Sequence, residues 1–562
     1  MPRPRARLCT ASVLASLLAL ACANGDEETA PGQLSAGNMS ATSTDTDTDT
    51  DTTVATTVGP GSGSGTGASE TDAPINCGDG ELDPGELCDD GPQNGQGYGW
   101  CNGVCSGLQT TSANAIYVAL SGDDAQPGTR AQPLRTVNAA ITKAAATEAD
   151  VFVAKGDYQE AATLTLAEGV SIYGGYDDAD DWSRAVDNLT RLEIAAPTAV
   201  VADDLTAPTV LHLLTITGAD ASAGASAYGL RANNSDGLQV IDIILEAGKG
   251  SRGNDGLTPA GAAASGGNGA PGQPGCEDSS GLCSTCAQPQ GGAAGSSSCG
   301  AQGGNGGAAG NGPASGAPGG QGAGGTPGGP GTPAAKGNWD TPSTYWGKDG
   351  AKGTNGQNGA AGAANYAASG YAPSPGAAGG NGESGKGGGG GGGGGGGENL
   401  CDSYGGGGGG GGGGGCGGEG GGGGSSGGAS IAAYLWASDV LFERVELRTG
   451  GGGAGGKAGA GQPGGQGGQG GKGTLSGAGG NYGGSDEQDD GSNGGRGGNG
   501  GAGGNGGAGG GGAGGPSIGV LNGGASAPTL TEVTYKLGPA GIGGTSTGQA
   551  GPPGEQVNTA TP

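Results

Sequence analysis

Short apolar segments, separated by polar and glycine-containing stretches, are the first regular feature along this chain. Between residues 115 and 248 they have the length and composition of strands, and successive groups start about 18–25 residues apart. The segments are Val151–Val153, Leu164–Leu166, Val170–Tyr173, Leu192–Ile194, Leu211–Ile216, Tyr228–Leu230 and Leu238–Leu245. This spacing predicts a solenoid in which each turn packs only on its neighbours.

A helical pattern precedes these strands. Its apolar residues lie on one face at helical spacing, and they are Leu134, Val137, Ile141 and Ala144 with Ala145. Such a helix can cover the open end of a β stack and protect its edge hydrogen bonds, although the same pattern also fits an ordinary surface helix.

Glycine then interrupts the strand pattern twice. The chain has 148 glycines, concentrated in residues 249–429 and 451–516. The same kind of strand end leads into glycine three times, at Ile243–Gly248, Val445–Gly450 and Val533–Gly538. Because insertions in a solenoid recur on one face, we expect both blocks to leave the same corner of the stack. Further coils at 430–450 and 517–540 and a tail at 541–562 complete this interpretation.

Within the blocks, glycine often recurs at every third residue, as in Gly316–Gly331, Gly347–Gly362, Gly376–Gly388 and Gly461–Gly473. A threefold extended helix would place these glycines along one bare face, so a bundle of polyglycine-type helices within the chain is one interpretation. The other is disorder, because glycine loses the most entropy on ordering. The register slips too often for a collagen triple helix.

The N-terminus predicts export. Arg3, Arg5 and Arg7 precede the apolar stretch Ala11–Leu20, so residues 1–21 have the pattern of a signal peptide. Residues 18–22 resemble a lipobox, which implies cleavage before Cys22 and lipidation of that cysteine. Cleavage after Ala21 by an ordinary signal peptidase is the alternative. Residues 22–76 are acidic and rich in Thr, Ser and Gly, which predicts a disordered tether between the membrane and the folded part.

Composition limits the function. The formal net charge is −30, only 4% of residues are aromatic, and there is one histidine. So few large side chains can fill only one modest packed domain. The acidity argues against a nucleic-acid partner, because binding to phosphates needs Lys and Arg. The expected attachment is a lipid anchor, and surface glycans or other cells are the candidate partners.

In an exported chain the remaining cysteines are expected to form disulfides. They fall into groups of four, four and two: Cys77, Cys88, Cys101 and Cys105; Cys276, Cys283, Cys286 and Cys299; and Cys401 and Cys416. Pairing within the fours stays open, whereas Cys401–Cys416 is the expected local pair. A zinc site at Cys283 and Cys286 is the alternative there, but no second close pair or nearby histidine supports it.

Residues 77–107 form a small module in which Cys77-Gly-Asp-Gly is followed by Gly-Glu-Leu-Cys88-Asp-Asp-Gly. This closely resembles the cysteine-rich repeat of myxobacterial-type surface proteins, which implies display outside the cell. So short a segment has no core of its own, so disulfides must hold it. Calcium is the cofactor to consider, since carboxylates gather here, but a solvated acidic turn explains them as well; they are Asp79, Asp83, Glu86, Asp89 and Asp90.

The solenoid itself resembles a known superfamily. Ile116-Tyr-Val-Ala-Leu-Ser-Gly-Asp, Val151-Phe-Val-Ala-Lys-Gly-Asp-Tyr and Val170-Ser-Ile-Tyr-Gly-Gly-Tyr are typical of its N-terminal coils. They are similar to those of right-handed parallel β-helix proteins of the pectate-lyase-like superfamily. The resemblance implies an all-β fold over 115–248, with a capping helix and glycine-rich insertions, and says little about activity.

Two functions follow. The first is a non-catalytic lipoprotein, structural or adhesive, that presents glycine-rich lobes at the cell surface. The alternative is a carbohydrate-binding or polysaccharide-lyase-like protein, since such β-helix enzymes combine a calcium-binding acidic cluster with a basic residue. Candidate residues for it are Asp177, Asp178, Asp180, Asp181, Asp203 and Asp204 with Arg184 or Arg191. A strongly acidic surface would repel acidic polysaccharides, and one histidine offers little for a catalytic triad, so no catalytic residue is assigned.

Overall fold

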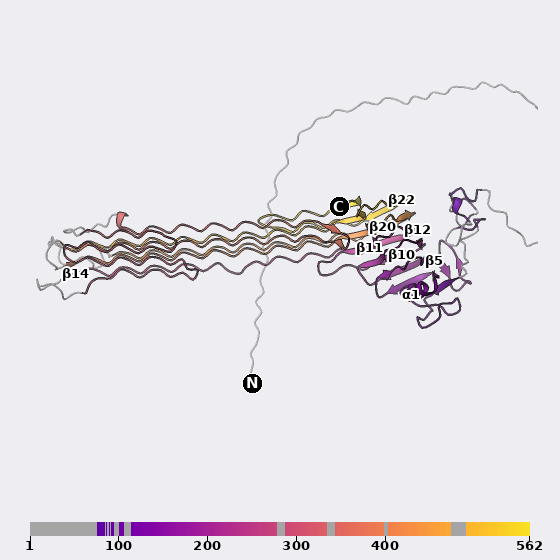
Figure 1. The fold of residues 1–562 in the computed structure, drawn as a ribbon, viewed down its shortest axis with the longest axis horizontal. Coiled ribbons are helices and arrows are strands. Elements are labelled where there is room, and N and C mark those ends of the chain that lie inside the picture. The colour runs from indigo at the N-terminus through magenta and orange to yellow at the C-terminus, as the bar shows by residue number, and fades with distance from the viewer. Residues whose placement is uncertain are drawn as a thin grey trace, which may run out of the picture. The chain divides into compact units, whose positions relative to one another are not determined.

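The computed structural model describes residues 76–84, 86, 89, 91–94, 101–105, 114–277, 287–333, 343–397, 403–473 and 491–562. Regular structure in these ranges is almost entirely β (Figure 1). The helices are α1 (Val137–Thr147) and the short 3-10 turns η1 (Gly91–Gln93) and η2 (Ser343–Tyr345). No helix in the described ranges combines the length and the hydropathy that crossing a membrane would need.

Parallel strands form three sheets; β1 belongs to the first sheet alone, and each later coil adds one strand to each sheet. The first sheet contains β1 (Ala115–Val118), β2 (Asp150–Ala154), β5 (Ile172–Asp177), β9 (Thr209–His212), β12 (Leu238–Ile241), β19 (Leu441–Glu443) and β22 (Thr529–Thr531), with β6 (Ser183–Arg184) antiparallel to β5. The second contains β3 (Gly156–Glu160), β7 (Thr190–Ile194), β10 (Thr215–Gly218), β13 (Ile244–Ala247), β20 (Glu446–Thr449) and β23 (Thr534–Leu537). The third contains β4 (Leu164–Thr165), β8 (Thr198–Asp203), β11 (Ala227–Asn233), β18 (Ser430–Trp436), β21 (Ser517–Gly523) and β24 (Gln556–Ala560). The expected all-β class and parallel β-helix are confirmed.

Apolar side chains stack in register along the inside of the coils. In the second sheet Leu192, Ile216, Leu245 and Leu447 are aligned partners, and each is at most 2% exposed. This ladder crosses from the early coils into the segment after the first glycine block. The later apolar segments are therefore coils of the same stack, with β18 paired to β11 and β23 paired to β20.

Single residues in the left-handed conformation turn the chain from the first sheet to the second. Leu213, Asp242, Arg444 and Glu532 occupy this corner in successive coils, with φ between 51° and 58°. The single strands expected at Leu211–Ile216 and Leu238–Leu245 are therefore wrong, because each is divided at Leu213 or Asp242. The apolar pattern alone does not show this corner, because the residues before and after it are buried in the same core.

Helix α1 packs against β1, β2 and β4 at the N-terminal end of the stack. The Thr136 side chain caps it by accepting a hydrogen bond from the Ala139 amide, and Val137, Ala140, Ile141 and Ala144 are buried. The expected capping helix is present. Leu134 is buried in the core but precedes the helix, and the fourth buried position belongs to Ala140 rather than Ala145.

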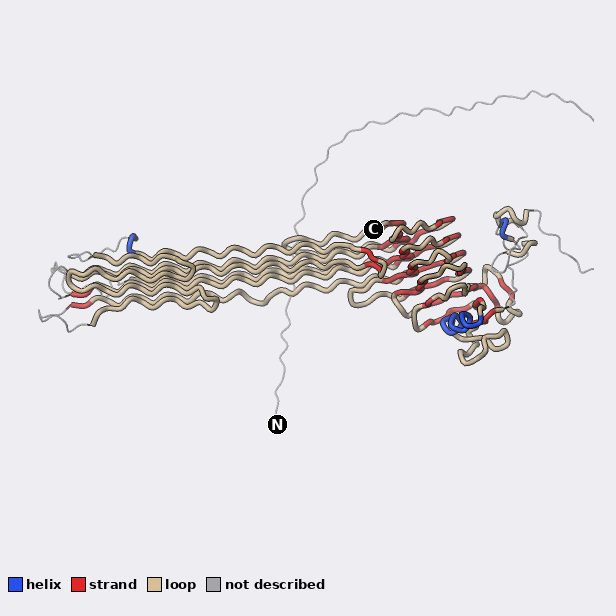
Figure 2. Tube along the Cα trace, in the orientation of Figure 1, coloured by secondary structure: helices blue, strands red, loops and turns tan. Residues whose placement is uncertain are grey.

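Both glycine blocks leave the corner between the second and third sheets, as expected. The first block connects β13 to β18, the second connects β20 to β21, and a shorter excursion, residues 538–555, connects β23 to β24. Figure 2 shows their long non-helical segments running side by side away from the coils. We call the described parts of these insertions the glycine lobe. Short pairs add local order: β14 (Cys276–Glu277) with β17 (Ser403–Tyr404), and β15 (Tyr366–Ala367) with β16 (Gly370–Tyr371).

Candidate functional site

The glycine lobe is ordered by hydrogen bonds between neighbouring extended segments. Amides of Gly412, Gly415 and Gly418 donate to the carbonyls of Gly498, Gly501 and Gly504 at 2.9–3.0 Å. Bonds that recur at every third residue are expected for threefold extended helices lying side by side. Of the two interpretations of the glycine blocks, the structure supports the bundle in the described ranges.

Segment 403–428 lies in the interior of this bundle. Three successive amides, those of Gly410, Gly411 and Gly412, donate to three different segments, at Ala270, Gly304 and Gly498. A Cβ atom on any of these glycines would lie 2.0–2.1 Å from a carbonyl oxygen. A helix surrounded on every side has no room for side chains, which explains the uninterrupted glycine in 405–415 and 387–397. Peripheral segments such as 347–362 need glycine only at every third residue.

Side-chain oxygens satisfy many outward-facing amides on the lobe surface. Asp255 accepts from the Lys457 amide at 2.8 Å, Asn358 from the Ala508 amide at 2.9 Å, and Asn499 from the Gly470 amide at 3.0 Å. The bonded pairs come from neighbouring helices. On the lobe surface, these short polar side chains therefore form the hydrogen bonds between neighbouring helices that backbone carbonyls form in the interior.

A disulfide joins Cys299 to Cys416, which are 117 residues apart in sequence. The expected pair Cys401–Cys416 is therefore wrong, and so is the expectation that Cys299 pairs within its own group of four. Distance along the sequence did not predict the partner of Cys416, because the lobe folds back on itself in antiparallel segments. These bring the turn at Ser297–Gly300 beside the central segment 403–428. Cys101 and Cys276 are also disulfide-bonded. Cys22, Cys88, Cys283, Cys286 and Cys401 lie outside the described residues.

The hairpin β15–β16 fixes the lobe to the outer face of the third sheet. The Tyr371 amide donates to the Tyr228 hydroxyl at 2.9 Å. The Tyr434 hydroxyl donates to the Ala367 carbonyl at 2.5 Å and accepts from the Ala367 amide at 3.2 Å. Sequence analysis missed this contact, although the tyrosines in Tyr366-Ala-Ala-Ser-Gly-Tyr371 stand out in a block almost without aromatic residues.

A chain of polar side chains crosses the corner between the first and second sheets. Arg184 donates to His212 Nδ1 at 2.6 Å, and His212 Nε2 lies 2.9 Å from Asp242, which also binds Arg444 at 2.7 and 2.9 Å. Burial and the Arg184 guanidinium lower the pKa of His212 to about 4, so the ring is neutral at pH 7. Burial opposes ionisation of Asp242, but hydrogen bonds from His212 and Arg444 outweigh it and lower its pKa to about 2.

This chain of contacts connects successive coils, and the charged groups of Arg184, Asp242 and Arg444 are all engaged in it. Arg184 also stacks against the rings of Tyr173 and Tyr176 and is 4% exposed. An open pocket of about 430 Å³ lies at the other end of this chain of contacts, where Asp242, Arg444, Glu446, Glu532 and Thr534 line it. Of the charged side chains that line the pocket, Arg444 is paired with Asp242, and Glu446 is paired with Arg448 and Lys536.

The residues considered for a lyase-like site do not converge. Asp177 binds Lys155 at 2.6 Å, Asp181 faces Arg130 at 3.4 Å, and Asp180 accepts from Ser183. Asp178, in the same turn as these three residues, accepts from Ser121. Elsewhere on the surface, Asp203 lies near Arg231, Asp204 accepts from Asn234, and Arg191 pairs with Asp157. Each group has a local structural partner, and the buried Arg184 is remote from solvent.

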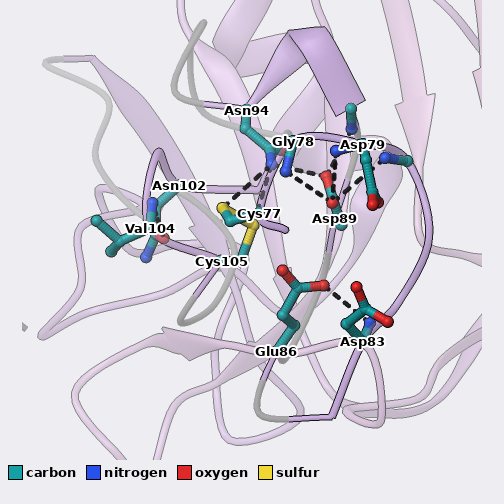
Figure 3. Close-up of a disulfide and its surroundings, with 12 residues drawn as sticks. Cys77, Gly78, Asp79, Asp83, Glu86, Asp89, Asn94, Asn102, Val104 and Cys105 are labelled. Atoms are coloured by element: carbon teal, nitrogen blue, oxygen red, sulfur yellow. Dashed lines mark hydrogen bonds between the residues drawn. A yellow bond between two sulfur atoms is a disulfide. The ribbon is translucent and has the colours of Figure 1, made fainter. Parts of the chain in front are cut away.

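In the cysteine-rich module, Asp89 organises the chain around the Cys77–Cys105 disulfide (Figure 3). Its Oδ2 accepts from the amides of Gly78, Asp79 and Gly80 at 2.7–3.3 Å, and its Oδ1 from Gly91 and Asn94 at 2.7 Å. Burial opposes the ionised form, but these donors hold the pKa of Asp89 below its usual value. A carboxylate surrounded by N–H donors is poorly placed to bind a cation.

The other calcium candidates also serve the loop. Asp79 accepts from the Glu81 amide, Asp83 from the Asn76 side chain, and Glu86 from the Asp83 amide. Among the described residues, Glu86 is grouped at ligand distance only with Cys77 and Cys105, whose sulfurs are bonded to each other. Asp90 lies outside the described residues. Each of the described carboxylates therefore accepts hydrogen bonds within the module, and calcium binding there stays a prediction.

Comparison with known proteins adds one finding. Residues 120–181, which include the first coils and helix α1, match a family described as "Protein of unknown function (DUF1565)". No curated protein and no solved structure matches the chain. What the comparisons identify is therefore a segment of the β-helix that is similar to this family of unknown function.

Proposed function

We propose that this chain is a non-catalytic protein of the cell surface, exported and anchored through a lipid on Cys22, whose β-helix presents the glycine lobe for structural or adhesive contact. The construction of the lobe carries the proposal. Its interior consists of hydrogen-bonded backbone, and its surface bears short polar side chains that bond to neighbouring helices. Such an element supplies length and stiffness rather than reactive groups.

The dimensions of the lobe support a role in display. At about 3.1 Å per residue, a segment such as 403–428 spans roughly 80 Å. Every outgoing segment is bonded to returning ones, so the lobe resists bending in a way that a flexible glycine linker does not. The Cys299–Cys416 disulfide suits an oxidising compartment outside the cytoplasm.

Deleting the lobe tests this function. In the deletion variant, residues 249–429 and 451–516 are each replaced by residues 219–226, which bridge the same corner between β10 and β11. We expect the variant to be exported and to keep the β spectrum of the solenoid, but to lose the contribution of the full chain to cell–cell or cell–surface adhesion. Unchanged adhesion would refute the proposal, and so would release of unsaturated sugars from acidic polysaccharides by the full chain.

The anchor is tested separately. Mass spectrometry of the mature N-terminus should find a diacylglyceryl adduct on Cys22, and a Cys22→Ser variant should leave the membrane fraction. If the mature chain begins with an unmodified Cys22, the lipid anchor is refuted and the protein is secreted rather than anchored.

A further inference from the structure

We propose that the C-terminal coil of the β-helix is a docking surface for a second copy of this chain, with the two end coils pairing antiparallel about a two-fold axis. The surface, called the end coil here, consists of β22, β23 and β24. It differs from the other end of the stack, where α1 packs over β1, β2 and β4.

The backbone of the end coil is paired on one side only. In the described ranges β22 pairs with β19, β23 with β20 and β24 with β21, and each is the last strand of its sheet. Unpaired strand edges invite further strands, and proteins usually protect them with charge, proline, bulges or a covering segment. Neither β22 nor β24 contains a charged residue or a proline.

The end of the apolar core is also open here. Leu530 is 37% exposed, whereas its aligned partner Phe442 is fully buried. Val533 and Tyr535 are only partly buried against the same core, although Leu447, the partner of Tyr535, is fully buried. A covering coil would remove this apolar surface from water and pair the strand edges at the same time.

Charge permits self-association at this end. The chain has a formal net charge of −30, yet residues 529–562 contain only Glu532, Lys536 and Glu555 as charged side chains. Lys536 already pairs with Glu446 of the preceding coil at 2.8 Å. Two copies that meet here therefore keep most of their acidic residues outside the contact.

The geometry selects a second copy over an isolated peptide. A peptide strand can pair with one edge, whereas the end coil presents three edges that belong to successive strands of one turn. A second end coil turned over by a two-fold axis presents three antiparallel edges of the same short lengths. Such an isologous contact closes after two copies, so it caps both stacks without forming a fibre.

The test measures the mass of the whole chain in solution, with Cys22→Ser so that no lipid drives association. A double variant, Thr531→Lys with Asn558→Lys, places exposed lysines on β22 and β24, which are two of the three strand edges that the contact would pair. The control, Gln466→Lys with Gln469→Lys, adds the same charge at exposed lobe positions whose amides bond to Ser265 and Asn268.

Light scattering during size-exclusion chromatography, with protein at 1 to 100 µM, should give the mass of a dimer for the parent and the control. The end-coil variant should have a dimer dissociation constant at least ten-fold higher than that of the parent. Far-ultraviolet circular dichroism should be the same for all three, which separates dissociation from misfolding. A parent that stays monomeric throughout, or a dimer that survives the end-coil lysines, overturns the proposal.

Discussion

Glycine at positions 410–412 is required by contact with neighbouring segments. Three successive residues meet carbonyl oxygens of three segments, so a side chain has nowhere to go. The requirement is weaker at Gly380: a Cβ there would meet its nearest atom, the Gln357 amide nitrogen, at 3.3 Å, a tight contact that a shift of a few tenths of an ångström relieves. Glycines at different places in the lobe therefore differ in how much their replacement by alanine should destabilise it, and this difference can be measured.

Gly412→Ala should destabilise the lobe, whereas Gly380→Ala should change it little. The Gly412 methyl group would lie 2.1 Å from the Gly468 carbonyl oxygen, and overpacking of this kind costs about 1–3 kcal/mol. Hydrogen exchange of amides in 403–428 reports the local free energy of opening. Equal effects of the two substitutions would show that this segment is not enclosed as described.

His212 makes stability depend on pH between about 4 and 6.5. Its folded pKa, about 4, lies below its usual value of 6.5, so the unfolded chain binds a proton in this window and the folded chain does not. The stability from the neutral, buried ring is complete above pH 6.5 and falls as the pH drops towards 4, by roughly 3 kcal/mol in total.

Two measurements check this pH dependence. His212 is the only histidine, so its NMR signals can be followed without overlap and should titrate near pH 4 rather than 6.5. In His212→Asn an amide can still accept from Arg184 and donate to Asp242, but it does not titrate, so the loss of stability between pH 6.5 and 4 should shrink. A midpoint near 6.5 would contradict the buried, neutral ring.

At the scale of elements, the hairpin β15–β16 joins two architectures with different periods. The solenoid repeats by coils, and the lobe repeats by three residues. Tyr228 and Tyr434 connect the two, because they bring hydroxyl groups from the third sheet to the backbone of the hairpin. Their rings also pack edge to face, with centroids 5.6 Å apart.

Tyr434→Phe should loosen this junction by about 1–2 kcal/mol, because it leaves the Ala367 amide and carbonyl without their partner. Tyr371→Phe is the matched control. The Tyr371 hydroxyl is buried without a hydrogen-bond partner, so its removal should be neutral or stabilising. Hydrogen exchange of residues 366–371 distinguishes the two, and a larger effect from Tyr371→Phe would contradict the assigned contacts.

At the scale of the whole molecule, one covalent bond closes a loop through most of the first glycine block. The 117-residue separation of Cys299 and Cys416 restricts the unfolded chain far more than a 15-residue loop would. In the chain-entropy description a loop of about 100 residues contributes roughly 4.7 kcal/mol, against about 3 kcal/mol for the shorter one.

The double variant Cys299→Ala with Cys416→Ala should therefore lose about 3–5 kcal/mol of stability and show earlier proteolysis of the lobe, while the solenoid coils stay protected. Peptide mapping under non-reducing conditions should recover the Cys299–Cys416 cross-link directly. A peptide containing Cys401 bonded to Cys416 would restore the local pairing that the structure contradicts.

Sequence reasoning succeeded where one period dominated. The apolar spacing of the early coils, the face containing Val137 and Ile141, and the three repeated strand ends are local patterns, and the structure bears out the fold they predict. It failed where partners are distant in sequence, as for the Cys401–Cys416 pair, because Cys416 bonds to Cys299. Asp177, Asp181 and Arg191 have the residue types of the alternative lyase site, and only the tertiary structure shows that each is paired locally.

The sequence by itself determined the solenoid, its capping helix and the corner from which the glycine blocks leave, because each coil repeats the same burial pattern and packs only on its neighbours. Tertiary structure alone decided whether glycine is ordered, which helix is enclosed, and which cysteine Cys416 reaches. Glycine has no side chain to encode a partner, so the partner of each segment depends on where the antiparallel passes of the folded lobe bring the backbone together.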